Sequence, residues 1–138
     1  MFKRIVLATD GSEHSIRSTK YAIELAEKFS GSIEVVYVID GQTAKADVLH
    51  SGDKFKIEQK RREKMKPVVD LLEDAKITYK VHLLHGEPGP EIVNFANGND
   101  SDCVIIGSRG LNNLQTFILG SVSHKVAKRV DCPVLIVK

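Results

Sequence analysis

Short apolar runs alternate with segments of helical periodicity along most of this chain. The runs are rich in Val and Ile, as expected of strands buried on both faces of a parallel sheet. Strands are predicted over residues 5–8, 33–39, 77–84, 103–106 and 134–137.

The segments between the runs carry apolar residues at the spacing of amphipathic helices. The first helix starts after a cap at Ser12 or Ser15 and stops before Gly31, and others cover 54–75, a stretch starting near Pro90, and 121–130. Because Pro67 lies inside the second helix, we expect a kink or two shorter helices there. Residues 40–53 are polar and lack a clear period, which predicts a mobile loop over a ligand site or a partner contact.

This alternation predicts one α/β domain over residues 1–138, with a doubly wound parallel sheet and helices on both faces. Two strand orders fit, 3-2-1-4-5 and 2-1-3-4-5. Ligands of such sheets bind beyond the carboxyl ends of the strands, where the order reverses. The first order would bring residues 9–11 against residues 107–110.

Composition narrows the function classes. The chain has 20 basic and 18 acidic side chains, and its net charge of +2 does not favour nucleic acid. The basic run 54–66 is interrupted by Glu58 and Glu63, so we interpret it as a solvated helix face rather than a nucleic-acid patch.

No apolar run is long enough for a membrane span or a signal peptide, and we expect a cytoplasmic protein. Scattered histidines and the absence of a C-x-x-C pair predict no metal site within the protein.

The segment 107–123 has the composition of a phosphate site. Glycines allow close approach of the backbone, and the start of the next helix favours anions. The segment contains neither G-x-x-x-x-G-K-[ST] nor G-x-G-x-x-G. Ordinary turns explain the glycines equally well, and N-capping explains the hydroxyls. The residues concerned are Gly107, Gly110, Gly120, Ser121 and Ser123.

Three further positions each admit two interpretations. Asp10 could hold a ribose or form a local Asx-turn. Val38 could line a base or belong to the core. Arg109 could bind phosphate oxygens or pair with a surface carboxylate.

The spacing Gly107-x-x-Gly110, nine residues, then Gly120-Ser121 resembles the nucleotide-binding signature of the universal stress protein family. The opening turn 6–12 and the ending 132–137 are similar to those of the same family. The resemblance implies a Rossmann-like 3-2-1-4-5 sheet, ATP binding, and a homodimer formed through the last strands.

The resemblance also implies roles for individual residues. Asp10 would hold the ribose, Ala8 and Thr9 would line the site through their backbones, and Val38 would lie against adenine. The phosphates would be surrounded by Gly107, Gly110, Gly120, Ser121, Val122 and Ser123, and Arg109 would lie beside them at a position that varies in the family.

Our leading hypothesis is an ATP-binding stress-response switch or sensor that takes Mg²⁺ or Mn²⁺ with the nucleotide and acts on an unidentified protein. Two alternatives stay open: a slow ATP hydrolase, and a nucleotide-free dimeric scaffold. Against hydrolysis, no Walker lysine follows the glycines and no second carboxylate is obviously placed for a metal. We predict no catalytic residue.

Overall fold

The computed structural model describes residues 1–108 and 120–138 and contains a five-stranded parallel sheet in the order β3-β2-β1-β4-β5. This confirms the first of the two predicted orders. The strands are β1 Arg4–Thr9, β2 Ser32–Ile39, β3 Tyr79–His85, β4 Cys103–Gly107 and β5 Val134–Val137. The helices are α1 Glu13–Phe29, α2 Gly41–Ser51, α3 Lys54–Asp74, α4 Pro88–Gly98 and α5 Ser121–Arg129.

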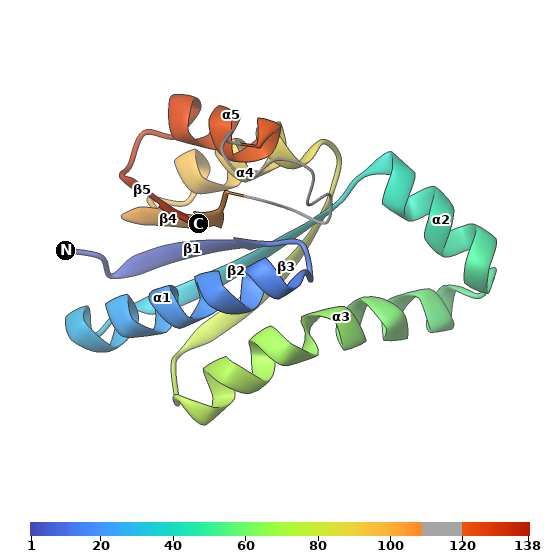
Figure 1. Cartoon of the computed structure of the whole chain (residues 1–138), viewed down its shortest axis with the longest axis horizontal. Coiled ribbons are helices and arrows are strands. Elements are labelled where there is room, and N and C mark those ends of the chain that lie inside the picture. The colour runs from blue at the N-terminus through green and yellow to red at the C-terminus, as the bar shows by residue number, and fades with distance from the viewer. Residues whose placement is uncertain (109–119) are drawn as a thin grey trace.

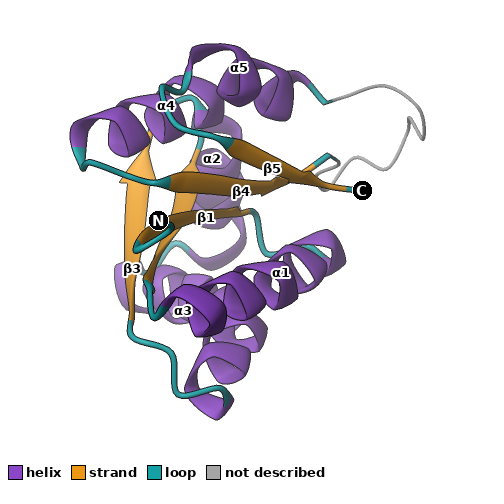
Figure 2. Ribbon diagram, turned by 90° about the vertical axis from the view of Figure 1, so that its left-hand side faces the viewer, coloured by secondary structure: helices purple, strands orange, loops and turns teal. Residues whose placement is uncertain are grey.

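The sheet is covered on both faces, with α1 and α3 on one side and α4 and α5 on the other (Figures 1 and 2). Successive residues of a strand point to opposite faces. Ile5 and Leu7 of β1 therefore enter the core beneath α1 and α3, while Val6 and Ala8 enter the core beneath α4 and α5. Burial on both faces explains why the strand sequences are continuously apolar.

The prediction of a loop over 40–53 is wrong in one respect, because residues Gly41–Ser51 form the helix α2. This helix packs on α3, and Ala44 joins a small apolar cluster with Tyr37 and Met65. A largely buried ion pair of 3.1 Å between Asp47 and Arg61 fixes it further. Tertiary contacts therefore hold a helix that the weak apolar periodicity of the segment did not predict.

Pro67 lies within a single continuous helix, so the alternative of two shorter helices is wrong. Its ring is on the exposed side of α3, whereas Met65, Val68 and Leu72 are buried against the sheet. Because the backbone carbonyl that loses its partner lies on the solvent side, water can satisfy it, and the buried side keeps the helix intact.

Among the described residues, no helix is both long and apolar enough to cross a membrane.

Candidate functional site

A cavity of about 690 Å³ lies beyond the carboxyl ends of β1, β2 and β4. This is where the strand order reverses, between β1 and β4. Most of its described lining comes from the ends of β1, β2 and β4 and the starts of α4 and α5, and α1 and α2 contribute one residue each. The lining residues are Ala8, Thr9, Asp10, Ser15, Tyr37, Val38, Asp40, Gln42, Pro88, Ile92, Ile106, Gly107, Ser108, Gly120, Ser121, Val122 and Ser123.

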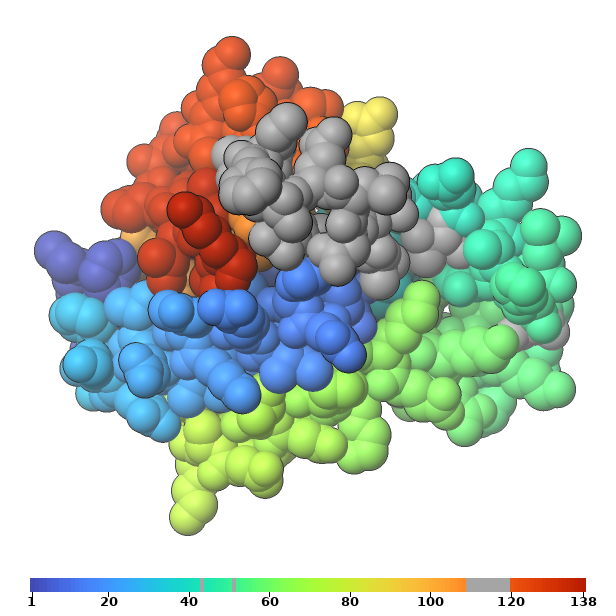
Figure 3. Space-filling model, viewed as in Figure 1, coloured from blue at the N-terminus to red at the C-terminus, as the bar shows by residue number. Residues whose placement is uncertain are grey.

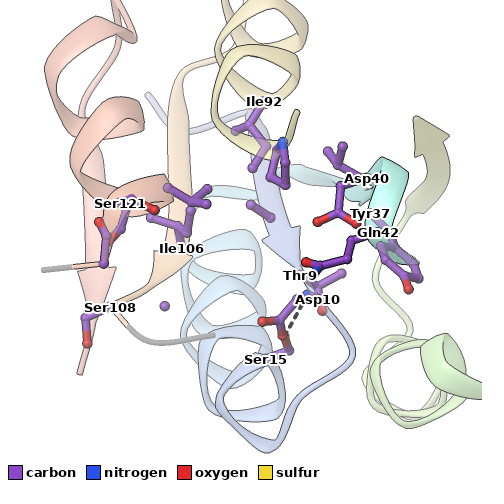
Figure 4. Close-up of a pocket in the computed structure, with 17 residues that line it drawn as sticks. Thr9, Asp10, Ser15, Tyr37, Asp40, Gln42, Ile92, Ile106, Ser108 and Ser121 are labelled. Atoms are coloured by element: carbon purple, nitrogen blue, oxygen red, sulfur yellow. Dashed lines mark hydrogen bonds between the residues drawn. The ribbon is translucent and has the colours of Figure 1, made fainter. Parts of the chain in front are cut away.

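Asp10 directly follows the carboxyl end of β1 and is held there by local hydrogen bonds (Figure 4). Its Oδ1 accepts the backbone N–H of Ser12 at 2.9 Å and the hydroxyl of Ser15 at 3.0 Å. Its own N–H donates to the Ser15 Oγ at 3.1 Å. The Asx-turn interpretation is therefore correct for Oδ1. Within the described part of the chain, no hydrogen bond occupies Oδ2, so this oxygen can accept bonds from a ligand.

The start of α5 forms the opposite side of the cavity. Gly120 is the N-cap residue, and no described side chain caps the helix. The first N–H groups of a helix lack intrahelical partners, so those of residues 121–123 are available to an anion. The Ser123 hydroxyl donates to the Gly120 carbonyl at 3.0 Å and does not cap the helix. The interpretation of the Ser121 and Ser123 hydroxyls as N-capping groups is therefore wrong, whereas their contact with phosphate stays a prediction.

Gly120 also brings two loops together. Its N–H donates to the Ser108 carbonyl at 3.2 Å, and a β-carbon at this position would lie 3.2 Å from the same oxygen. The absence of a side chain thus lets the start of α5 approach the end of β4. Arg109 and Gly110, which we predicted to contact phosphate, lie outside the described residues.

The two sides of the cavity differ in their charged and polar groups. Figure 4 shows Ser108 and Ser121 on one side and Tyr37, Asp40 and Gln42 on the other, with Asp10 between them. Two of the described lining residues, Asp10 and Asp40, are carboxylates, and none is Lys or Arg. An anionic group would therefore be repelled from the Asp40 side and attracted to the start of α5.

Tyr37 connects the cavity to α2 and α3. Burial raises the pKa of its phenol, the negative charge of Asp47 raises that pKa further, and the positive charge of Arg61 acts against both. The phenol is consequently protonated at neutral pH and can donate a hydrogen bond.

Sequence reasoning missed some of the lining residues. Ser108 adjoins the predicted glycine loop, and Ser15 lies five positions after Asp10, so both could have been found from their neighbours. Gln42 was missed because a polar segment without a clear period gives no signal for a helix. The others missed are Tyr37, Asp40, Pro88, Ile92 and Ile106, whose apolar or strand-end positions gave no separate signal.

A doubly wound parallel sheet with a cavity at its reversal point defines an α/β protein of the Rossmann-like type, as in its solved relatives. The model of the universal stress protein family matches residues 1–138, and the chain belongs to that family.

Individual relatives agree with this assignment. The universal stress protein MJ0531 of Methanocaldococcus jannaschii is 33% identical over 143 residues, covering 100% of this chain and 83% of that protein. YxiE of Bacillus subtilis is 31% identical over 149 residues, with both chains covered completely.

Solved structures show the same fold. The structure of MJ0577, also from M. jannaschii, matches with a TM-score of 0.86 and 32% identity, covering 100% of this chain and 96% of that chain. A universal stress protein solved in complex with cAMP matches with a TM-score of 0.69 and 25% identity, covering 99% and 96% of the two chains.

Proposed function

We propose that this protein binds ATP in the cavity beyond the carboxyl ends of β1 and β4 and acts as a nucleotide-dependent switch or sensor in a stress response. The proposal rests on one observation: a carboxylate and the start of a helix face each other across the same cavity. Asp10 presents an uncommitted carboxylate oxygen on one side, and α5 presents uncapped N–H groups on the other. A nucleotide has the matching polarity, with ribose hydroxyls at one end and phosphates at the other.

The proposed orientation follows from charge. The phosphates lie at the start of α5, against Gly107 and residues 120–123, because the two carboxylates would repel them elsewhere. The ribose lies at Asp10, beside the backbone of Ala8 and Thr9. The base then lies against Val38. A volume of about 690 Å³ falls in the usual range for small-molecule sites.

We further propose that a divalent cation, Mg²⁺ or Mn²⁺, enters with the nucleotide. The described lining offers no cationic side chain to balance the phosphates. The described residues also contain no cluster of three or more His, Cys, Asp or Glu side chains suited to a metal. Such an ion would be held mainly by phosphate oxygens and waters, as is common for Mg²⁺.

The relative bound to cAMP supports an adenine nucleotide as the ligand class. On this proposal, residues 1–138 act as one nucleotide-binding domain. Combined base, ribose and phosphate contacts of roughly −7 to −9 kcal/mol would give dissociation constants near the micromolar range.

Calorimetric titration of the Asp10→Asn variant with MgATP tests the ribose contact. The asparagine Oδ1 can still accept from Ser12 and Ser15, so the turn survives, but an NH₂ donor replaces the oxygen that faces the ligand. We expect at least a tenfold loss of affinity, since a hydrogen bond to a charged group contributes about 1.5–3 kcal/mol.

Asp102→Asn is the matched control. Asp102 also accepts backbone N–H groups, from Lys3 at 2.8 Å and Arg4 at 3.0 Å, but at the opposite end of β1. ATP affinity should be unchanged in this control. Equal affinity in the Asp10→Asn variant and the wild type would exclude the ribose role.

A further inference from the structure

The junction of α2 and α3 forms a corner at the end of the molecule opposite both termini (Figure 1). We call residues 45–62 the α2–α3 corner. Gly52, with φ of +61°, ends α2, and its N–H donates to the Val48 carbonyl at 2.9 Å. The Asp53 carboxylate then caps α3 by accepting the N–H of Phe55 at 3.0 Å. The backbone of the corner is thus defined by a glycine turn followed directly by a helix cap.

Three large apolar side chains of this corner are in contact with solvent. Val48 is 58% exposed, Leu49 77% and Phe55 73%. They account for half of the large hydrophobic residues that are exposed in the described part of the chain. Ala44 and the Asp47–Arg61 pair already attach α2 to α3, so these three side chains are not needed to hold the two helices together. A concentration of apolar surface of this kind indicates an interaction site.

The exposed residues of the α2–α3 corner carry an excess of positive charge. The corner has five exposed basic residues and only two exposed acidic ones, and the carboxylate of Asp53 is engaged in the helix cap. The basic residues are Lys45, Lys54, Lys56, Lys60 and Arg62. Two copies of the corner facing one another would therefore bring like charges together, which disfavours a second copy of this chain as the partner.

We propose that the α2–α3 corner docks on the surface of an anionic lipid bilayer. Leu49 and Phe55 enter the boundary between headgroups and acyl chains, and the lysines contact the lipid phosphates. The corner projects from the body of the molecule (Figures 1 and 3), and a projecting apolar tip suits a deformable lipid surface. A partner helix, in contrast, would need a groove. This surface lies outside the nucleotide cavity, and the proposal does not depend on ATP binding.

The absence of tryptophan from the sequence allows a direct test. In a Phe55→Trp variant, the single tryptophan reports on its own environment at the corner. On titration with vesicles of phosphatidylcholine and phosphatidylglycerol, its emission should shift to shorter wavelength, and added salt should weaken the effect. Pure phosphatidylcholine vesicles should give little shift.

Tyr21→Trp is the matched control, because Tyr21 is an exposed aromatic residue of α1, 47% exposed and outside the corner. Its emission should stay constant with the same vesicles. No shift for Phe55→Trp, or an equal shift for both variants, would overturn the proposal. So would an equal shift of Phe55→Trp with heparin or single-stranded RNA, since these polyanions have no apolar phase.

Charge-neutralising variants test the lysines. Lys54→Gln/Lys56→Gln in the Phe55→Trp background should lower the vesicle partition coefficient about 30-fold, given the attraction of each lysine to an anionic surface. Lys28→Gln/Lys128→Gln removes the same net charge from exposed positions on α1 and α5, and should change it less than about threefold. Equal losses in the two double variants would assign binding to net charge and contradict docking through the corner.

Discussion

Gly31 shows how one missing side chain fixes the start of β2. A β-carbon at this position would lie 2.5 Å from the carbonyl oxygen of Phe2 and 3.0 Å from that of Lys3. The neighbouring Ser32 N–H donates to the Lys3 carbonyl at 2.8 Å, so the two segments cannot separate without loss of a hydrogen bond. Gly31 therefore ends the turn after α1 and also permits the close approach of the N-terminal segment.

Gly31→Ala should lower the free energy of unfolding by about 1–3 kcal/mol, the usual cost of forcing an extra carbon into packed structure. Gly98→Ala is the control, because a β-carbon at this last residue of α4 would meet nothing within 4 Å apart from its chain neighbours and the adjacent backbone of its own helix. It should be neutral or stabilising by up to about 1 kcal/mol. Denaturant unfolding of both variants measures the difference. If Gly31→Ala were as stable as Gly98→Ala, the close contact would be disproved.

For single residues, the sequence was sufficient to predict which residues lie at the site, but not which of their atoms form hydrogen bonds within the protein. The position of Asp10 at the end of a buried strand was enough to predict that it faces the cavity. The division of its oxygens between Ser12, Ser15 and solvent depends on side-chain geometry, which sequence spacing does not determine. The same holds for Ser123, whose hydroxyl turns back to the Gly120 carbonyl.

At the scale of elements, α2 contacts both the cavity and α3. Gln42 of its first turn lines the cavity, and Asp47 further along the helix pairs with Arg61 of α3. The charges of this pair act on Tyr37, which also lines the cavity. A change at the pair should therefore be measurable at the phenol.

Replacement of each partner should move the pKa of Tyr37 in opposite directions. Asp47→Asn removes a negative charge that raises this pKa, so the pKa should fall. Arg61→Gln removes a positive charge that lowers it, so the pKa should rise. Ultraviolet titration, with a Tyr37→Phe variant to identify the signal, measures both shifts. Shifts of the same sign would contradict the placement of this ion pair beside the phenol.

Prediction from sequence succeeded for elements with strong apolar periodicity and failed for α2. The strands and α1 carry continuous or regularly spaced apolar residues, which local patterns detect. The contacts that hold α2 join it to α3 and β2 through Ala44, Asp47 and Arg61, and they appear only in three dimensions. Pro67 favours a break in the helix on local grounds, but α3 stays continuous because its other side is buried against the sheet.

At the scale of the whole molecule, the alternation of strands and helices predicted the layers, and the family resemblance selected the strand order. The edge strands are β3 and β5. The carbonyl of Pro133 accepts the N–H of Val104 in β4, and the carbonyl of Val137 accepts the N–H of Ser108, which follows β4. Every second residue of β5 therefore directs its backbone N–H and C=O groups toward β4, and the residues between direct theirs away from the sheet. The outward backbone groups are those of Val134 and Ile136, and we propose that the homodimer implied by the family resemblance would form through them.

Ile136→Pro tests that homodimer. It removes an outward N–H while leaving the ladder with β4 intact, because proline is tolerated on edge strands. Sedimentation equilibrium should show a weaker dimer than the wild type, with the circular dichroism spectrum retained. Leu135→Pro, which removes an inward N–H, should instead destabilise the fold. An unchanged dimer in folded Ile136→Pro would argue against association through β5.

The most direct test of the central claim uses the weak absorbance of a chain with no Trp and three Tyr. The protein is incubated with excess ATP and Mg²⁺, separated from free nucleotide by rapid gel filtration, and measured at 260 and 280 nm. We predict a large rise in the 260/280 ratio, corresponding to about one nucleotide per chain, and release of intact ATP on denaturation. A ratio equal to that of protein never exposed to ATP, together with no thermal stabilisation when ATP and Mg²⁺ are present, would contradict the account.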